Sequence, residues 1–222
     1  MQPARIARRT FLLSLVPLLA VQVPLSVAQA QQRRRSGADP SARRIVGELR
    51  HRGFTMQLAI SGLPNRAALE TAMRHQLDIV ADSGVKPQIL ALWRSIPLML
   101  VPSTGKGGGE FRAGHGIEID AVPTPPPENP VVLHEFIHAL HYRYLPQGNA
   151  NPDVMRFYQI AVQNQLYPEG SYVLKNRSEF FAVTGSLYLW GKVARPPHDR
   201  ETLRTKQPRY YQWLGDLFGV KK

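Results

Sequence analysis

The segment VVLHEFIHALHYRY, residues 131–144, is a short apolar run that contains three histidines and one glutamate. Such polar groups cost free energy when they are buried without partners. On an α-helix each residue turns by about 100°, so His134 and His138 lie on one side, a turn apart, with Glu135 beside them. Two imidazoles at this spacing can bind one metal ion, and the neighbouring glutamate can act on a water molecule. The HExxH motif therefore predicts a metal centre of the kind found in zinc peptidases.

A catalytic zinc site needs a third protein ligand and one open position. The sequence contains no cysteine, so this ligand must be histidine, aspartate or glutamate. His141 lies a turn beyond His138, where one straight helix would hold all three ligands poorly. We expect His141 to lie behind the ligands or to contact the substrate. Glu179 has two open interpretations: it is a metal ligand, or it forms a capping box in which its carboxylate binds the Asn176 N–H.

Two strings, LHEFIHALH and SYVLKNRSEFFA, resemble the zinc-peptidase domain of anthrax toxin lethal factor and its bacterial relatives. The resemblance continues more weakly through HDRETLRTKQPRYYQWLGDLF and says little about residues 31–115. It implies a gluzincin-like α+β fold. It also implies that His134, His138 and Glu179 hold one zinc ion and that Glu135 is the catalytic base.

The resemblance further implies a catalytic role for Tyr172, which stands seven residues before Glu179, where the family has an assisting tyrosine. A plain core aromatic is the alternative interpretation of Tyr172, because eight tyrosines in the sequence make a chance match possible. One position departs from the family: a second glutamate, four residues after the ligand in lethal factor, is Val183 here. His134, His138 and Glu179 are still expected to hold the metal ion in spite of this difference.

The hydrophobic pattern predicts strands only in the first part of the chain and mainly helices after them. Apolar and polar residues alternate over 54–61, which is typical of a half-buried strand, and short apolar segments predict strands over 96–101 and 116–122. Helical spacing predicts helices over 65–82, 130–145, 153–166, 178–190, 199–206 and 208–218, with Asn65 and Asn129 as N-caps and Pro130 as the first residue of its helix. The expected fold is α+β, with a small mixed or antiparallel sheet followed by a mainly helical C-terminal part.

The glycine-rich segment PSTGKGGGEFRAGHG lies between two of the expected strands. It lacks the GxxxxGK[ST] pattern of a phosphate-binding loop. We expect residues 103–115 to form a mobile loop that closes over a bound substrate. The strand expected over 116–122 would form the rim of the cleft and pair with an extended peptide.

The N-terminus has the features of an export signal. Three arginines precede an apolar stretch over 11–27, and Ala28-Gln29-Ala30 fits a signal-peptidase site. The string ARRTFLLSL also resembles a twin-arginine signal. A retained membrane anchor is the alternative, which Pro17 and Pro24 disfavour. We expect a signal peptide over 1–30 and an exported protein, in the periplasm or outside the cell.

The remaining chain is expected to contain a disordered basic linker, 31–44, and one zinc-peptidase domain, 45–222. Without residues 1–30, which carry three arginines and no acidic residue, the formal charge of +12 becomes +9. Most of these charges are scattered, so we expect no nucleic-acid binding. No permanent membrane anchor is expected either, because prolines interrupt the apolar stretch over 11–27.

The expected function is an exported zinc metalloendopeptidase with peptide or protein substrates. One alternative is a non-catalytic envelope binding protein that zinc stabilises, although a purely structural site has no need of Glu135. A weaker alternative is a relative of the Mlc titration factor, which the export signal disfavours.

Overall fold

The computed structural model describes residues 44–103, 108–122 and 129–222. In chain order the elements are β1 (Gly47–His51), β2 (Phe54–Leu58), α2 (Arg66–Ala81), α3 (Pro87–Arg94), β3 (Leu98–Val101), β4 (Gly109–Arg112), β5 (Gly116–Asp120), α4 (Val131–Arg143), η2 (Gly148–Ala150), α5 (Pro152–Gln163), η3 (Tyr172–Leu174), α6 (Arg177–Trp190), α7 (Arg200–Lys206) and α8 (Pro208–Phe218).

The strands of the described residues form one mixed sheet of five strands in the order β1-β2-β3-β5-β4. Strands β2, β3 and β5 run parallel, whereas β1 and β4 are antiparallel to their neighbours. In this register Met56 lies opposite Leu98, and Leu98 lies opposite Ile117, so these apolar side chains form one row across the sheet. A mixed sheet followed by helices confirms the predicted α+β class.

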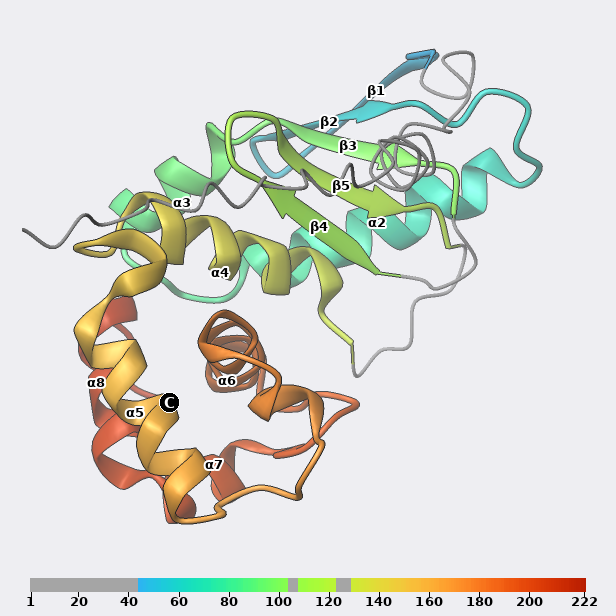
Figure 1. Cartoon of the computed structure of the whole chain (residues 1–222). Helices are drawn as coiled ribbons and strands as arrows, with labels where there is room; N and C mark the ends of the chain where they lie inside the picture. The colour runs from blue at the N-terminus through green and yellow to red at the C-terminus, as the bar shows by residue number, and fades with distance from the viewer. Residues whose placement is uncertain (1–43, 104–107, 123–128) are drawn as a thin grey trace, which may run out of the picture. The chain divides into compact units, whose positions relative to one another are not determined.

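One face of the sheet is buried and the other is partly open. In β2 the residues alternate strictly between buried and exposed, with Phe54, Met56 and Leu58 buried. Such alternation is expected when only one face of a sheet meets the core. Helices α2 and α4 run along one side of the sheet (Figure 1). This packing places the predicted metal-binding helix directly beneath the sheet.

Three strands agree with the predicted ones, although each is shorter than expected: β2, β3 and β5. Strand β1 was not predicted, and the expected mobile loop over 103–115 is wrong for Gly109–Arg112, which form β4. The string GEFR has no alternation of apolar residues, so only its pairing with β5 makes it a strand. The predicted rim strand, β5, lies inside the sheet, and β4 forms the edge.

The predicted helices all form within a few residues of their expected ends, whereas α3 was not predicted. It has eight residues, which is too short for helical periodicity to stand out. Asn65 precedes α2 as expected, but its side chain makes no capping hydrogen bond.

The predicted N-cap of α4 is wrong, because α4 begins at Val131 with Pro130 in the cap position. The backbone polar groups at the start of α4 find hydrogen-bond partners on another helix. The buried Gln76 side chain of α2 donates to the Asn129 carbonyl at 3.2 Å and accepts from the Val132 N–H at 3.3 Å. A polar side chain of α2 therefore replaces the local cap.

Helix α6 lies between α4 and the outer helices α5, α7 and α8 (Figure 1). All its residues from Phe180 to Leu189 are buried, as expected for a helix that is surrounded on all sides. Gly185 faces Ile137 of α4, and a Cβ atom there would lie 3.1 Å from the Ile137 Cδ1. The absence of a side chain at Gly185 lets α6 approach α4 closely.

All described residues belong to one compact unit. The predicted signal peptide, 1–30, and nearly all of the predicted linker, 31–44, lie outside the described residues, so both stay predictions. Among the described helices none is long and apolar enough to span a membrane.

Candidate metal centre

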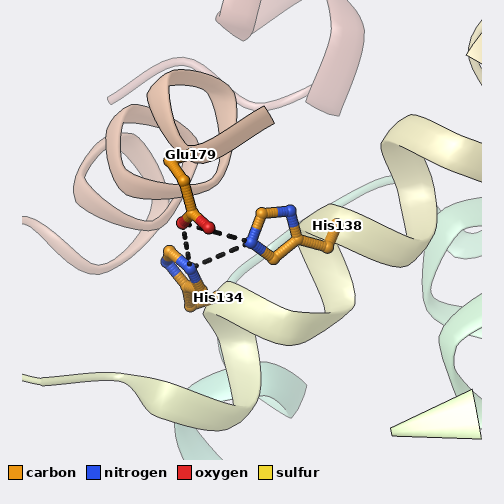
Figure 2. A group of neighbouring side chains, drawn as sticks. All are labelled: His134, His138 and Glu179. Carbon is orange, nitrogen blue, oxygen red and sulfur yellow. Dashed lines mark hydrogen bonds and ion pairs between the residues drawn. The ribbon is translucent and has the colours of Figure 1, made fainter. Parts of the chain in front are cut away.

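Helix α4 carries both histidines of the motif on the side that faces α6 (Figure 2). Their ring centroids lie 4.7 Å apart, and the ring planes are nearly perpendicular. The two Nε2 atoms are 3.1 Å apart. Positions i and i+4 of a helix normally bring side chains onto one face, and here the rings turn the same nitrogen toward a common point.

Glu179 reaches this point from the first turn of α6 (Figure 2). Its Oε2 atom lies 3.3 Å from the His134 Nε2 and 3.4 Å from the His138 Nε2. The capping interpretation is only half correct. Asn176 does cap α6, since its Oδ1 accepts from the N–H groups of Ser178 and Glu179. The Glu179 carboxylate points to the two imidazoles instead of back to Asn176.

The three side chains fit a metal ion. Donor atoms of a tetrahedral zinc ion with bonds of 2.0–2.1 Å are about 3.3–3.4 Å apart, close to the observed 3.1, 3.3 and 3.4 Å. The Glu179 Oε2 is buried and makes no hydrogen bond of acceptable geometry within the described residues. A buried acceptor without a hydrogen bond is costly, and a cation between it and the rings would compensate it. His134, His138 and Glu179 are also the one group of such donors found in the described residues.

The charge of this site favours an ionised carboxylate. Burial alone would raise the pKa of Glu179, but the imidazoles of His134 and His138 lower that pKa well below its usual range. The His138 Nδ1 lies 3.0 Å from the Ser178 Oγ, which orients the ring from behind. Metal-binding histidines commonly have such a partner. Ser178 was not predicted as part of the site, and its position next to Glu179 is the one sequence signal that points to it.

Glu135 lies beside the cluster and does not belong to it. It is 5% exposed, and its carboxylate accepts a hydrogen bond of 2.9 Å from the Phe111 N–H of β4. Burial raises the pKa of Glu135, while His134, His138 and the Phe111 N–H lower it less. A raised pKa suits a group that must take up and release a proton near neutral pH.

Strand β4 restrains Glu135 sterically as well. A Cβ atom at Gly109 would lie 2.7 Å from the Glu135 Cγ and 2.7 Å from the Ile119 Cδ1. Only glycine fits between these two side chains. Neither Gly109 nor Phe111 was predicted as part of the site, because their strand could not be recognised from the sequence.

Tyr172 lies in the short helix η3, which leads into α6. Its ring centroid is 6.5 Å from that of His134. Burial, followed by the neighbouring Glu179 carboxylate, raises the pKa of Tyr172 to about 12. The hydroxyl therefore stays protonated through neutral pH and can donate a hydrogen bond.

Two adjoining hollows open at these residues. Cavity A has a volume of about 170 Å³, and cavity B has a volume of about 240 Å³. Both are lined by Gly109, His134, Glu135 and Tyr172. Cavity B also contains His138 and Glu179, whereas cavity A extends toward Val131, Val183 and Arg195. The candidate metal site is therefore accessible to a small molecule or a peptide.

The structure corrects the expectation for His141. Its side chain is 0% exposed, so it does not contact a substrate. The ring packs edge-on against Phe181 at 5.0 Å, and neither ring nitrogen has a hydrogen-bond partner within the described residues. Burial, together with the charges of His138 and Arg177, lowers the pKa of His141 to about 4. His141 is a neutral core residue.

We expect His141→Leu to stabilise the metal-free protein at pH 7 by about 1–3 kcal/mol, because it removes two unpaired buried nitrogens. In the wild type the unfolded chain takes up a proton near pH 6.5, whereas the folded chain does so only near pH 4. The free energy of unfolding should therefore fall by up to about 3 kcal/mol as the pH drops through this window. Urea unfolding at pH 7, 5 and 4 measures both effects.

The leucine variant should lack this part of the pH dependence. His75→Leu, at an exposed position of α2, is the matched control and should keep it. If the free energy of unfolding of His141→Leu depended on pH as strongly as that of the wild type, His141 would not be the titrating core residue.

No family model matches the sequence, and no curated protein matches it. A solved structure, that of a Pro-Pro endopeptidase from Paenibacillus alvei, is similar with a TM-score of 0.50 and 18% sequence identity. The match covers 73% of this chain and 97% of that chain. At this identity the likeness shows a shared fold. The resemblance to lethal factor is not tested by it and stays a prediction.

Proposed function

We propose that this chain is a zinc-dependent endopeptidase that hydrolyses peptide bonds. The observation that carries the proposal is the convergence of two imidazole nitrogens and one carboxylate oxygen, 3.1–3.4 Å apart, beside a buried glutamate in an accessible cavity. The shared fold with an endopeptidase supports it. His134, His138 and Glu179 would hold the zinc ion, and Glu135 and Tyr172 would act on the substrate.

A bound zinc ion would act as a Lewis acid and make a water molecule more acidic. Glu135, held by the Phe111 N–H, would accept a proton from the attacking water and deliver it to the leaving nitrogen. The protonated hydroxyl of Tyr172 would donate a hydrogen bond to the oxygen of the carbonyl under attack. This division of roles agrees with the raised pKa of both groups.

Strand β4 is the best candidate for positioning an extended substrate. It pairs with β5 on one side, forms the edge of the sheet on the other, and contributes Gly109, Glu110 and Phe111 to the wall of cavity B. An extended peptide can add to such an edge through main-chain hydrogen bonds. The substrate strand is therefore expected along β4 and not along β5.

The expected export of the protein belongs to this proposal. An enzyme without cysteine does not depend on disulfide chemistry in either compartment. Processing after Ala30, observed as the N-terminal sequence of the mature protein in the periplasm or the medium, would support it. Retention of residues 1–30 in a cytoplasmic protein would contradict it.

The test of the function is a peptide-library digest of the mature protein, analysed by mass spectrometry together with metal analysis. The library should include Pro-Pro peptides, because the structural neighbour is a Pro-Pro endopeptidase. We expect cleavage that stops with a chelator and returns with zinc. Cleavage that persists without metal would contradict the proposal. A protein that holds zinc but cuts nothing would instead fit the binding-protein alternative.

Tyr172→Phe should lower kcat/KM for any cleaved peptide by about 10²–10³-fold, the usual cost of losing one donor to the developing negative charge. The zinc content should stay the same, because the hydroxyl is not one of the three donors. Tyr144→Phe, at an exposed tyrosine on the surface, is the matched control. Wild-type kinetics in Tyr172→Phe would show that Tyr172 is a core aromatic only.

A further inference from the structure

Cavity A has an uneven distribution of charge. Its walls come from β4, the start of α4, the middle of α6 and the segment after α6. Apart from His134, its lining includes one carboxylate, Glu135, and one permanent cation, Arg195; the others are Gly108, Gly109, Asn129, Pro130, Val131, Tyr172, Val183, Ser186 and Val193. Glu135 is engaged by the Phe111 N–H. The guanidinium is the permanent positive charge that a ligand on this wall would meet.

The aromatic ring of Tyr172 holds Arg195 in place. The guanidinium carbon lies 4.1 Å from the ring centroid, within the range of a cation–π contact. A guanidinium in a cation–π contact keeps its N–H donors, which lie in the plane of the group. The ring contact therefore restrains the guanidinium at the wall of cavity A.

A second cation at the same ring provides a comparison. The Lys175 Nζ lies 5.1 Å from the Tyr172 centroid, so both cations contribute similar charge near this ring. Lys175 does not line cavity A; it lines a separate hollow with Asn149, Met155 and Tyr158. A ligand in cavity A would touch Arg195 but not Lys175.

We propose that Arg195 makes cavity A a recognition site for an acidic side chain of the peptide, at a position next to the scissile bond. The inference rests on the proposed peptidase function, since cavity A shares His134, Glu135 and Tyr172 with the reacting centre. A guanidinium presents paired N–H donors that match the two oxygens of a carboxylate. Glutamate or aspartate satisfies this fork, whereas glutamine or asparagine offers one neutral acceptor.

The test compares pairs of peptides that differ only in having glutamate or glutamine at one position. The peptide-library digest identifies a cleaved sequence, and Glu/Gln pairs are then made at each position next to the cut. At one position the wild type should cleave the Glu peptide with a kcat/KM about 10-fold above that of its Gln partner, as a partly exposed charge-assisted contact gives. Arg195→Ala should reduce this ratio to about one, and Arg195→Glu should favour a Lys peptide at the same position.

Lys175→Ala is the matched control and should keep the Glu/Gln ratio of the wild type. The proposal is overturned if the wild type shows no Glu/Gln preference at any position. It is also overturned if Lys175→Ala removes the ratio as fully as Arg195→Ala does, because general positive charge would then explain it. An equal loss of kcat/KM for Glu and Gln peptides in Arg195→Ala would show that Arg195 acts through Tyr172 instead.

A binding measurement separates this proposal from the peptidase function. Fluorescence anisotropy of labelled library peptides, with Glu or Gln at a fixed central position, is measured on the zinc-loaded Glu135→Gln variant. If the wild type cleaves nothing, the proposed function fails, and this measurement still decides the role of Arg195. Tighter binding of the Glu peptides that disappears with Arg195→Ala supports the recognition site, and equal binding overturns it.

Discussion

Glu135→Gln is expected to abolish nearly all peptide hydrolysis and to leave the zinc content unchanged. Glutamine has the shape of glutamate and can still accept the hydrogen bond from the Phe111 N–H, but it cannot take up a proton. Loss of a general base typically lowers the rate by about 10²–10⁴-fold. The carboxylate is not among the three clustered donors, so metal binding does not depend on it. Metal per chain and kcat/KM should be measured on the same preparation.

The control for this variant is Glu110→Gln. Glu110 also lines cavity B, but its carboxylate is paired with Arg112 at 2.7 Å. We expect this change to alter kcat/KM by a few-fold at most, since exposed ion pairs contribute little. If Glu135→Gln and Glu110→Gln had the same small effect, Glu135 would not be the base.

Glu179→Ala is expected to remove high-affinity zinc binding and, with it, peptide hydrolysis. The change deletes one of three protein donors, so it should exceed the 10–100-fold loss of affinity that is typical when a ligand's outer hydrogen-bond partner is removed. A bound metal stabilises the folded state by about 2.7 kcal/mol when its concentration is 100 times Kd. The rise in Tm that zinc gives the wild type should therefore be absent in the variant.

Asn176→Ala is the informative comparison, because the capping interpretation of Glu179 assigned both residues to one structure. The Asn176 Oδ1 makes the capping bonds, so Asn176→Ala should cost about 1 kcal/mol of stability in the metal-free protein. Asn176→Ala should keep zinc binding, which Glu179→Ala should lose. Equal losses in the metal-free state, with zinc binding preserved in Glu179→Ala, would show that the carboxylate serves the helix and not a metal.

The local features of the fold could be read from the sequence. A helical period is set by neighbouring residues, so α2, α4, α5 and α6 were predicted close to their observed ends. The same rule placed His134 and His138 on one face, since positions four apart always meet on an α-helix. Elements without a local signal were missed: α3 is short, and β4 exists because β5 pairs with it.

The contributions of β4 to the site were missed for the same reason. The Phe111 N–H reaches Glu135 and Gly109 leaves room for it only after the sheet has formed. The capping of α4 is similar, because Gln76 of α2 supplies it from 53 residues away in the chain. The N-cap preference that pointed to Asn129 could not predict this hydrogen bond from a distant helix.

The sequence by itself determined the HExxH pair, the helix that carries it and the absence of cysteine ligands, because each depends on residue type and spacing along a few turns. Only the tertiary structure turned the Glu179 carboxylate toward the two imidazoles, buried His141 in the core and placed Arg195 over Tyr172. The first two outcomes depend on how closely α6 packs against α4. That distance is set by side-chain volume at contacts such as Gly185 and Ile137, which lie far apart in the chain.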